Sequence, residues 1–249
     1  MSTLVPTPAG GKALVRPGFR WDAADAYLFD IDGTLLNSRD AVHYFAFQSA
    51  MRAILDLEAS IDGVHVHGNT DPGIVRAVLQ RAGLGHAAID AHMPQIVAHI
   101  LSEVERNRDQ LRPELCPSVP DLLAFLQSRG KLLGTASGNL EPLGWLKLEK
   151  AGIKPMFAFG SFSFPRESRA EIFRHGAELA RQRLGPGATI TVIGDTPFDI
   201  QAARAAEMPV IALATGIFSF ADLALHNPDA CFGCGTDLLA LVGHEPLET

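Results

Sequence analysis

The chain has 249 residues and a mass of 26.7 kDa, and 47% of its residues are hydrophobic and 20% charged. These values are typical of a globular protein with one or two domains and exclude an intrinsically disordered chain. The formal net charge of -7 argues against a basic surface for nucleic acid. The sequence shows no membrane-spanning apolar run and no secretory signal, and its three cysteines are too few for a disulfide framework. We therefore expect a cytoplasmic protein that binds neither nucleic acid nor membrane.

The first part of the chain divides into an arm, a strand and a long helical stretch. Residues 1 to about 24 contain three Pro and three Gly, so we expect an irregular arm. Residues 26–34 (AYLFDIDGT) contain a short apolar run that stops at Asp32 and Gly33, which predicts a buried strand followed by a turn. Residues 38–116 carry apolar side chains at helical spacing without a strong strand pattern, so we expect helices there.

From Pro117 onward, helices and strands alternate. The pattern predicts helices at residues 119–128, 143–151, 168–184 and 200–207, and strands at residues 131–137, 156–162, 188–195 and 209–216. Such alternation is typical of an α/β fold with a doubly wound, mostly parallel sheet. We expect an α/β core formed by residues 1–37 and 117–249, with residues 38–116 inserted as a helical domain.

Polar residues follow three of the predicted strands. They are Asp30, Asp32, Ser137, Gly138, Asn139, Asp195 and Asp199. In an open α/β sheet, ligands bind in the crevice beyond the carboxyl ends of the strands. Up to four carboxylates are therefore expected to face one crevice.

Carboxylates this close together repel one another, and a bound divalent cation is the usual remedy. A site made of oxygen ligands favours Mg²⁺, which one or two carboxylates hold together with waters and a substrate phosphate. We expect Asp30 and Asp195 to be direct ligands, and Asp199 to act through a water or from behind the ligands.

The two acids at the end of the first strand suggest a division of roles. One carboxylate could attack a phosphoryl group, and the other could donate and accept protons. Attack on phosphorus depends mainly on positioning and charge neutralisation. Groups that bind the phosphate oxygens are expected at the two neighbouring strand ends: Gly33, Thr34, Ser137, Gly138 and Asn139.

These motifs resemble those of the haloacid dehalogenase-like superfamily, and the resemblance extends over residues 27–239. DIDGT at residues 30–34 resembles motif I, the strand ending in Ser137 resembles motif II, and GDTPFD at residues 194–199 resembles motif IV. The resemblance implies an Asp30 nucleophile and an Asp32 that serves as general acid and base while its backbone carbonyl binds Mg²⁺. It also implies that residues 38–116 form a C1-type cap that closes over small substrates.

The chain departs from the family at motif III, where most members have Lys. No Lys lies between Phe159 and Asp195, and Arg169 stands at the expected place. A guanidinium can neutralise a carboxylate and a phosphate, so we expect Arg169 to take over this role.

Two features narrow the activity within the family. The family's true dehalogenases have no acid at the position of Asp32, and residues 38–116 contain no Lys for a phosphonatase Schiff base. Residues 68–84 and 137–153 resemble the phosphoglycolate phosphatase-like members. We therefore expect a magnesium-dependent phosphatase acting on a small phosphate ester, phosphoglycolate-like or a sugar phosphate.

Two other functions remain open from the sequence. A phosphosugar mutase of the same family would share motif I and the cap. A non-catalytic phospho-acceptor module could also cluster Asp residues at a sheet edge, although such modules lack an insertion after the first strand. The chain is expected to be a monomer or a homodimer.

Overall fold

The computed structural model describes residues 3–6, 12–38, 40–58 and 60–241. Its centre is an eight-stranded sheet with the order β1-β2-β10-β9-β8-β3-β6-β7. The strands are β1 (Thr3–Pro6), β2 (Lys12–Val15), β3 (Ala26–Phe29), β6 (Leu132–Leu140), β7 (Phe159–Ser163), β8 (Ile190–Gly194), β9 (Val210–Leu213) and β10 (Ala230–Phe232). The six strands from β10 to β7 are parallel, which confirms the predicted fold class.

The expectation of an irregular N-terminal arm is wrong for part of that segment. β1 and β2 pair antiparallel, and β2 pairs antiparallel with β10, so the arm extends the sheet. Ala13 is fully buried at this junction. The apolar run in β2 is short and lies between Pro and Gly residues, so it gives little strand signal in the sequence. Its pairing with β1 and β10 defines it as a strand. Residues 1–2 and 7–11 of the arm lie outside the described residues.

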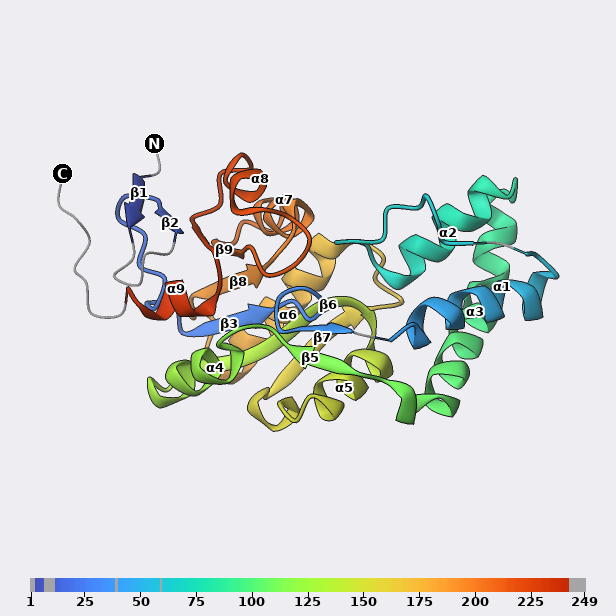
Figure 1. The fold of residues 1–249 in the computed structure, drawn as a ribbon, viewed down its shortest axis with the longest axis horizontal. Helices are drawn as coiled ribbons and strands as arrows, with labels where there is room; N and C mark the ends of the chain where they lie inside the picture. The colour runs from blue at the N-terminus through green and yellow to red at the C-terminus, as the bar shows by residue number, and fades with distance from the viewer. Residues whose placement is uncertain (1–2, 7–11, 39, 59, 242–249) are drawn as a thin grey trace.

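Helices cover both faces of the sheet (Figure 1). On one face lie α4 (Val119–Ser128), α5 (Glu141–Lys150) and α9 (Gly235–Leu239), and on the other lie α6 (Arg169–Leu184), α7 (Pro197–Ala205) and α8 (Phe220–Ala224). Successive residues of β3 alternate between the two apolar layers, because Tyr27 packs with the first set and Leu28 with the second. Burial on both faces explains why the strand reads as a continuous apolar run.

Three further helices form a separate layer beyond one end of the sheet (Figure 1). They are α1 (Val42–Leu55), α2 (Asp71–Arg81) and α3 (His86–Arg106), and they share an apolar cluster of their own. Two short antiparallel strands, β4 (Leu36–Ser38) and β5 (Pro113–Leu115), lie where the chain leaves for these helices and where it returns. We call residues 38–116 the helical insert.

Two single turns of 3₁₀-helix, Arg108–Gln110 and Lys154–Met156, complete the secondary structure of the described ranges. No helix in these ranges has the length and apolar composition needed to cross a bilayer.

Candidate active site

The register of the parallel strands brings the predicted acidic residues together. In β3, Phe29 lies opposite Ile193 of β8 and Thr135 of β6. The next residue, Asp30, therefore begins its turn beside Asp195, and its backbone N–H donates to the carbonyl oxygen of Ile193 at 2.9 Å. Parallel strands end at the same edge of a sheet, so three motifs far apart in the sequence share one place.

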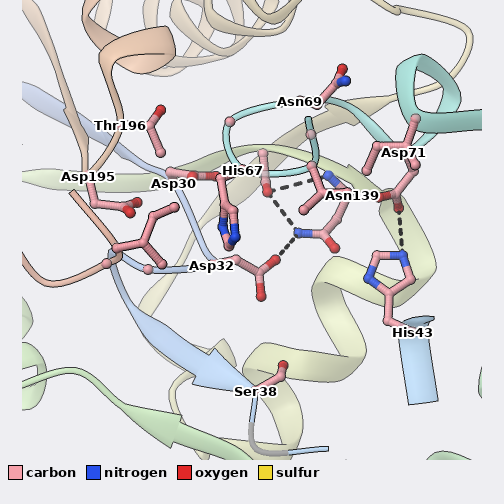
Figure 2. Close-up of a pocket in the computed structure, with 18 of the residues that line it drawn as sticks. Asp30, Asp32, Ser38, His43, His67, Asn69, Asp71, Asn139, Asp195 and Thr196 are labelled. Atoms are coloured by element: carbon pink, nitrogen blue, oxygen red, sulfur yellow. Dashed lines mark hydrogen bonds and ion pairs between the residues drawn. The ribbon is translucent and has the colours of Figure 1, made fainter. Parts of the chain in front are cut away.

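A cavity of about 350 Å³ opens over this edge, between the sheet and the helical insert (Figure 2). The sheet edge and the start of α6 contribute most of the predicted residues to its lining: Asp30, Asp32, Gly33, Ser137, Gly138, Asn139, Arg169 and Asp195. The insert contributes apolar side chains and two histidines, among them Phe47, Ile74, His43 and His67. A cavity of this size suits a small molecule.

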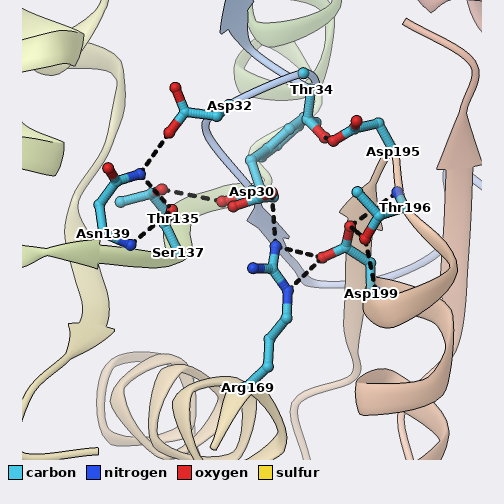
Figure 3. Close-up of polar contacts among 12 residues, drawn as sticks. Asp30, Asp32, Thr34, Thr135, Ser137, Asn139, Arg169, Asp195, Thr196 and Asp199 are labelled. Carbon is cyan, nitrogen blue, oxygen red and sulfur yellow. Dashed lines mark hydrogen bonds and ion pairs between the residues drawn. The ribbon is translucent and has the colours of Figure 1, made fainter. Parts of the chain in front are cut away.

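Three buried carboxylates gather at this edge of the sheet (Figure 3), and two of them, Asp30 and Asp195, line the cavity. Asp30, Asp195 and Asp199 each offer an oxygen, and these oxygens lie within 4.8 Å of one another. Arg169, at the start of α6, reaches two of them: Nη2 lies 2.6 Å from Asp30 Oδ2, and Nε donates to Asp199 Oδ1 at 2.7 Å. Arg169 thus contacts Asp30, the predicted nucleophile, while its role in place of the motif III Lys stays a prediction.

The charges of this cluster do not balance in the described part of the chain, because three carboxylates face one guanidinium. Burial raises the pKa of Asp30 to about 6, and Asp199 and Asp32 add to the rise while Arg169 opposes it. Burial and the negative charges of Asp199 and Asp30 also raise the pKa of Asp195 well above its usual range.

The donor set fits a hard divalent cation. Asp30 and Asp195 present carboxylate oxygens, and the excess negative charge is what such an ion would neutralise. The backbones of Gly33 and Gly216 approach the Asp195 carboxylate so closely that a side chain at either position would collide with it. Gly33 has φ +85°, which favours glycine. Asp32 is not in this carboxylate group, because its side chain turns toward Asn139 (Figure 3).

Magnesium should therefore stabilise the protein more at neutral than at acidic pH. A carboxyl whose pKa is raised on folding stabilises the fold below its unfolded value of 3.8, and this contribution is lost as pH rises through about 6. Mg²⁺ relieves the repulsion between the ionised groups, so we expect a larger rise in melting temperature at about pH 7.5 than at about pH 5. Asp195→Asn should remove most of this rise. Equal rises at both pH values in the wild-type protein would contradict the assignment.

Asp199 is more constrained than the sequence suggested. The segment after β8 forms a capping box at the start of α7: Thr196 Oγ1 accepts from the Asp199 backbone N–H, and Asp199 Oδ2 accepts from the Thr196 backbone N–H. The other oxygen, Oδ1, faces Arg169. Both oxygens thus have protein partners, so Asp199 orients Arg169 from behind the site.

The turn after Asp30 does not offer Gly33 and Thr34 to phosphate oxygens as the sequence predicted. The backbone N–H of Gly33 donates to the carbonyl oxygen of Leu36 at 2.8 Å, so it is not a free donor for phosphate. The hydroxyl of Thr34 donates to Asp195 Oδ1 at 2.8 Å, which orients that carboxylate. Turn geometry of this kind cannot be derived from the DIDGT pattern alone. Ser137 and Gly138, in contrast, both line the cavity.

Lys147, a buried residue of α5, belongs to the site but is not among the residues that the sequence predicted. Its ammonium group donates to both carboxylate oxygens of Asp32, at 2.8 and 2.7 Å, and to Asn139 Oδ1 at 3.0 Å. Burial raises the pKa of Asp32, but the charge of Lys147 and the hydrogen bond from Asn139 outweigh it, and the net shift is downward. Helical periodicity could have found Lys147, because it lies one turn after the buried Leu143.

The helical insert contacts the core directly beside these residues. Arg76 of α2 makes a bidentate contact with Glu167, which lies two residues before Arg169. Its Nε donates to Oε2 at 2.8 Å and its Nη2 donates to Oε1 at 2.7 Å. Asp71 accepts from the backbone N–H of Leu140 at 2.8 Å, and its carboxylate faces His43 at 3.3 Å. These contacts hold the insert over the cavity. His67 points into the cavity (Figure 2). His65, two residues earlier, packs against Phe198 instead.

Comparison with known proteins decides the family. Residues 24–207, more than half of the chain, match haloacid dehalogenase-like hydrolases. The chain belongs to this family. The match confirms the family that motifs I, II and IV predicted.

Similar proteins within the family carry more specific names. A phosphoglycolate phosphatase of Synechococcus elongatus is 28% identical over 219 residues, which cover 87% of this chain and 96% of that protein. A predicted phosphoglycolate phosphatase from Haemophilus somnus shares the fold, with a TM-score of 0.61, 20% identity and coverage of 88% of this chain and 97% of that one. A β-phosphoglucomutase from Clostridium difficile also shares it, with a TM-score of 0.58, 17% identity and coverage of 81% and 87%.

Proposed function

We propose that this hydrolase is a magnesium-dependent phosphatase that cleaves a small phosphate monoester through an aspartyl-phosphate intermediate. The cluster of Asp30, Asp195 and Asp199 around Arg169, beside a cavity of about 350 Å³, carries the proposal. The family supports hydrolysis, and the name of the Synechococcus relative supports a phosphate ester as substrate.

In the first step, a carboxylate oxygen of Asp30 attacks the phosphorus atom. A bond forms between Asp30 and phosphorus, the bond to the leaving oxygen breaks, and Asp32 gives that oxygen a proton, so that an alcohol departs. In the second step, Asp32 takes a proton from water, the water oxygen bonds to phosphorus, and Asp30 is released as a carboxylate together with inorganic phosphate. Bound Mg²⁺ would supply positive charge to the phosphoryl oxygens in both steps.

The surrounding residues support the phosphoryl group. Arg169 neutralises the Asp30 carboxylate and adds positive charge where the transferred group gathers negative charge. Ser137 Oγ accepts from Asn139 Nδ2 at 2.9 Å, so its own hydrogen is free to donate to a phosphate oxygen. Gly138 lets the insert approach, since a side chain there would collide with the backbone of Asn69.

The helical insert acts as a cap over a catalytic core made of residues 1–37 and 117–249. Its apolar lining and the contacts of Arg76 and Asp71 with the core support water exclusion during phosphoryl transfer. Among the described residues of the insert, His43 and His67 are the histidines that line the cavity. These two imidazoles are the insert's candidates for contacting an anionic or hydroxylated leaving group, as in phosphoglycolate or a sugar phosphate.

A screen of phosphate release over soluble phosphate esters, with and without Mg²⁺, tests the proposal. We expect Mg²⁺-dependent release of inorganic phosphate from at least one small ester and none in the presence of a chelator. The resemblance to a mutase fold makes phosphosugar isomerisation the second candidate. A product with phosphate moved to another hydroxyl, with little free phosphate, would favour the mutase. No turnover of any ester would contradict both.

A further inference from the structure

Lys147 is buried in the protein but directed at the edge of the active-site cavity. The side chain is 3% exposed, whereas the Asp32 side chain that it contacts is 43% exposed. Both residues line the cavity. Lys147 therefore approaches Asp32 from the protein side and leaves the cavity side of the carboxylate open.

All three donors of the ammonium group have partners in this arrangement. Two hydrogen bonds go to the two oxygens of Asp32, and one goes to Asn139 Oδ1. Asn139 in turn donates from Nδ2 to Asp32 Oδ2 at 2.6 Å and to Ser137 Oγ at 2.9 Å. Lys147 and Asn139 thus form a cradle that gives the Asp32 carboxylate three hydrogen bonds and a fixed orientation.

A contribution to stability does not explain why a lysine occupies this buried position. Its helix packs apolar side chains such as Leu143 and Leu148 against the protein, and an apolar residue at position 147 would pack there without a desolvation cost. An ion pair with a half-exposed carboxylate gains little, because solvent screens it. The other cation of the site, Arg169, contacts Asp30 and Asp199. Each of the two acids at the end of β3 therefore has its own cation.

We propose that Lys147 is a positioning residue that holds the Asp32 carboxyl group at the leaving-group side of the cavity. The inference rests on the proposed function, in which Asp32 transfers protons. Lys147 touches Asp32 and Asn139 and has no donor left for substrate, so its main effect is expected in the steps that need Asp32.

A comparison of esters with different leaving groups distinguishes this positioning role from a purely structural one. The ratio kcat/KM reports the steps up to departure of the alcohol. p-Nitrophenolate is a stable anion and departs without a proton, whereas an alkoxide needs the proton that Asp32 supplies. Loss of Lys147 should therefore harm an alkyl phosphate far more than p-nitrophenyl phosphate.

The experiment compares Lys147→Met and Lys147→Gln with Lys150→Met, in the full chain with Mg²⁺. Lys150 lies on the same helix, contacts Asp109 at the surface and is outside the cavity lining, so its variant should behave like the wild type. For both Lys147 variants we expect kcat/KM to fall about 10²–10³-fold with an alkyl phosphate and less than about 5-fold with p-nitrophenyl phosphate. Asp32→Asn should show the same selectivity.

Three results would overturn the proposal: equal losses with both esters, no loss with either, or failure of both Lys147 variants to fold, which would assign the residue to stability. Failure of the proposed function looks different. In that case the wild-type protein itself releases no phosphate from either ester, before any variant is compared.

Discussion

Asp30→Asn is expected to abolish phosphate release, with a fall in kcat of at least about 10⁴-fold. The amide has nearly the same shape as the carboxylate but cannot attack phosphorus. The fold should persist, because Asn removes one charge from a cluster in which three carboxylates face the guanidinium of Arg169. We therefore expect an unfolding midpoint equal to or above that of the wild-type protein when no Mg²⁺ is present.

The matched control for this variant is Asp121→Asn. Asp121 is exposed in the first turn of α4 and is not among the residues that line the cavity. Its variant should keep wild-type turnover. Turnover by Asp30→Asn within about 10-fold of the wild type would remove Asp30 from the role of nucleophile.

Arg169→Met is expected to lose both activity and stability. The guanidinium lies 2.6 Å from Asp30 and 2.5 Å from Asp199, and all three side chains are buried. Its removal leaves two buried carboxylates without their cation, which typically costs about 3–5 kcal/mol of unfolding free energy. Denaturant unfolding without Mg²⁺ measures this loss, and phosphate release with Mg²⁺ should fall in the same variant.

Two further variants serve as controls for Arg169→Met. Arg181→Met changes an exposed residue in the last turn of the same helix and should alter stability by less than about 1 kcal/mol. Arg169→Lys should recover part of the stability, since a single ammonium cannot reproduce the fork between two carboxylates. An Arg169→Met protein as stable as the wild type would show that the cluster does not depend on this ion pair.

The sheet and its acidic edge could be predicted because both leave local signals. A buried parallel strand is an uninterrupted apolar run, and an acid directly after such a run must lie at the carboxyl edge of the sheet. Asp30 and Asp195 follow from this rule. Arg169 required the family resemblance, because nothing in the local pattern of α6 marks its first residue as a partner of Asp30.

The missed features depend on contacts between distant segments. β2 becomes a strand through pairing with β10, more than 200 residues away in the chain. Helical periodicity places Lys147 on the same face of α5 as the buried Leu143, but only the packing of that helix beside Asp32 gives it a role. The contact between Arg76 and Glu167 joins residues 91 positions apart. Local periodicity carries no information about such pairs.

The central claim is that the Asp30 carboxylate becomes phosphorylated during turnover. Acid quenching during steady-state turnover, followed by borohydride reduction and peptide mapping, tests it directly, because borohydride reduces an aspartyl phosphate to homoserine. We predict homoserine at position 30 in the wild-type protein when substrate and Mg²⁺ are present, and unmodified aspartate when substrate is omitted. Reduction at a different carboxylate, or full turnover without any reducible acyl phosphate, would contradict the account.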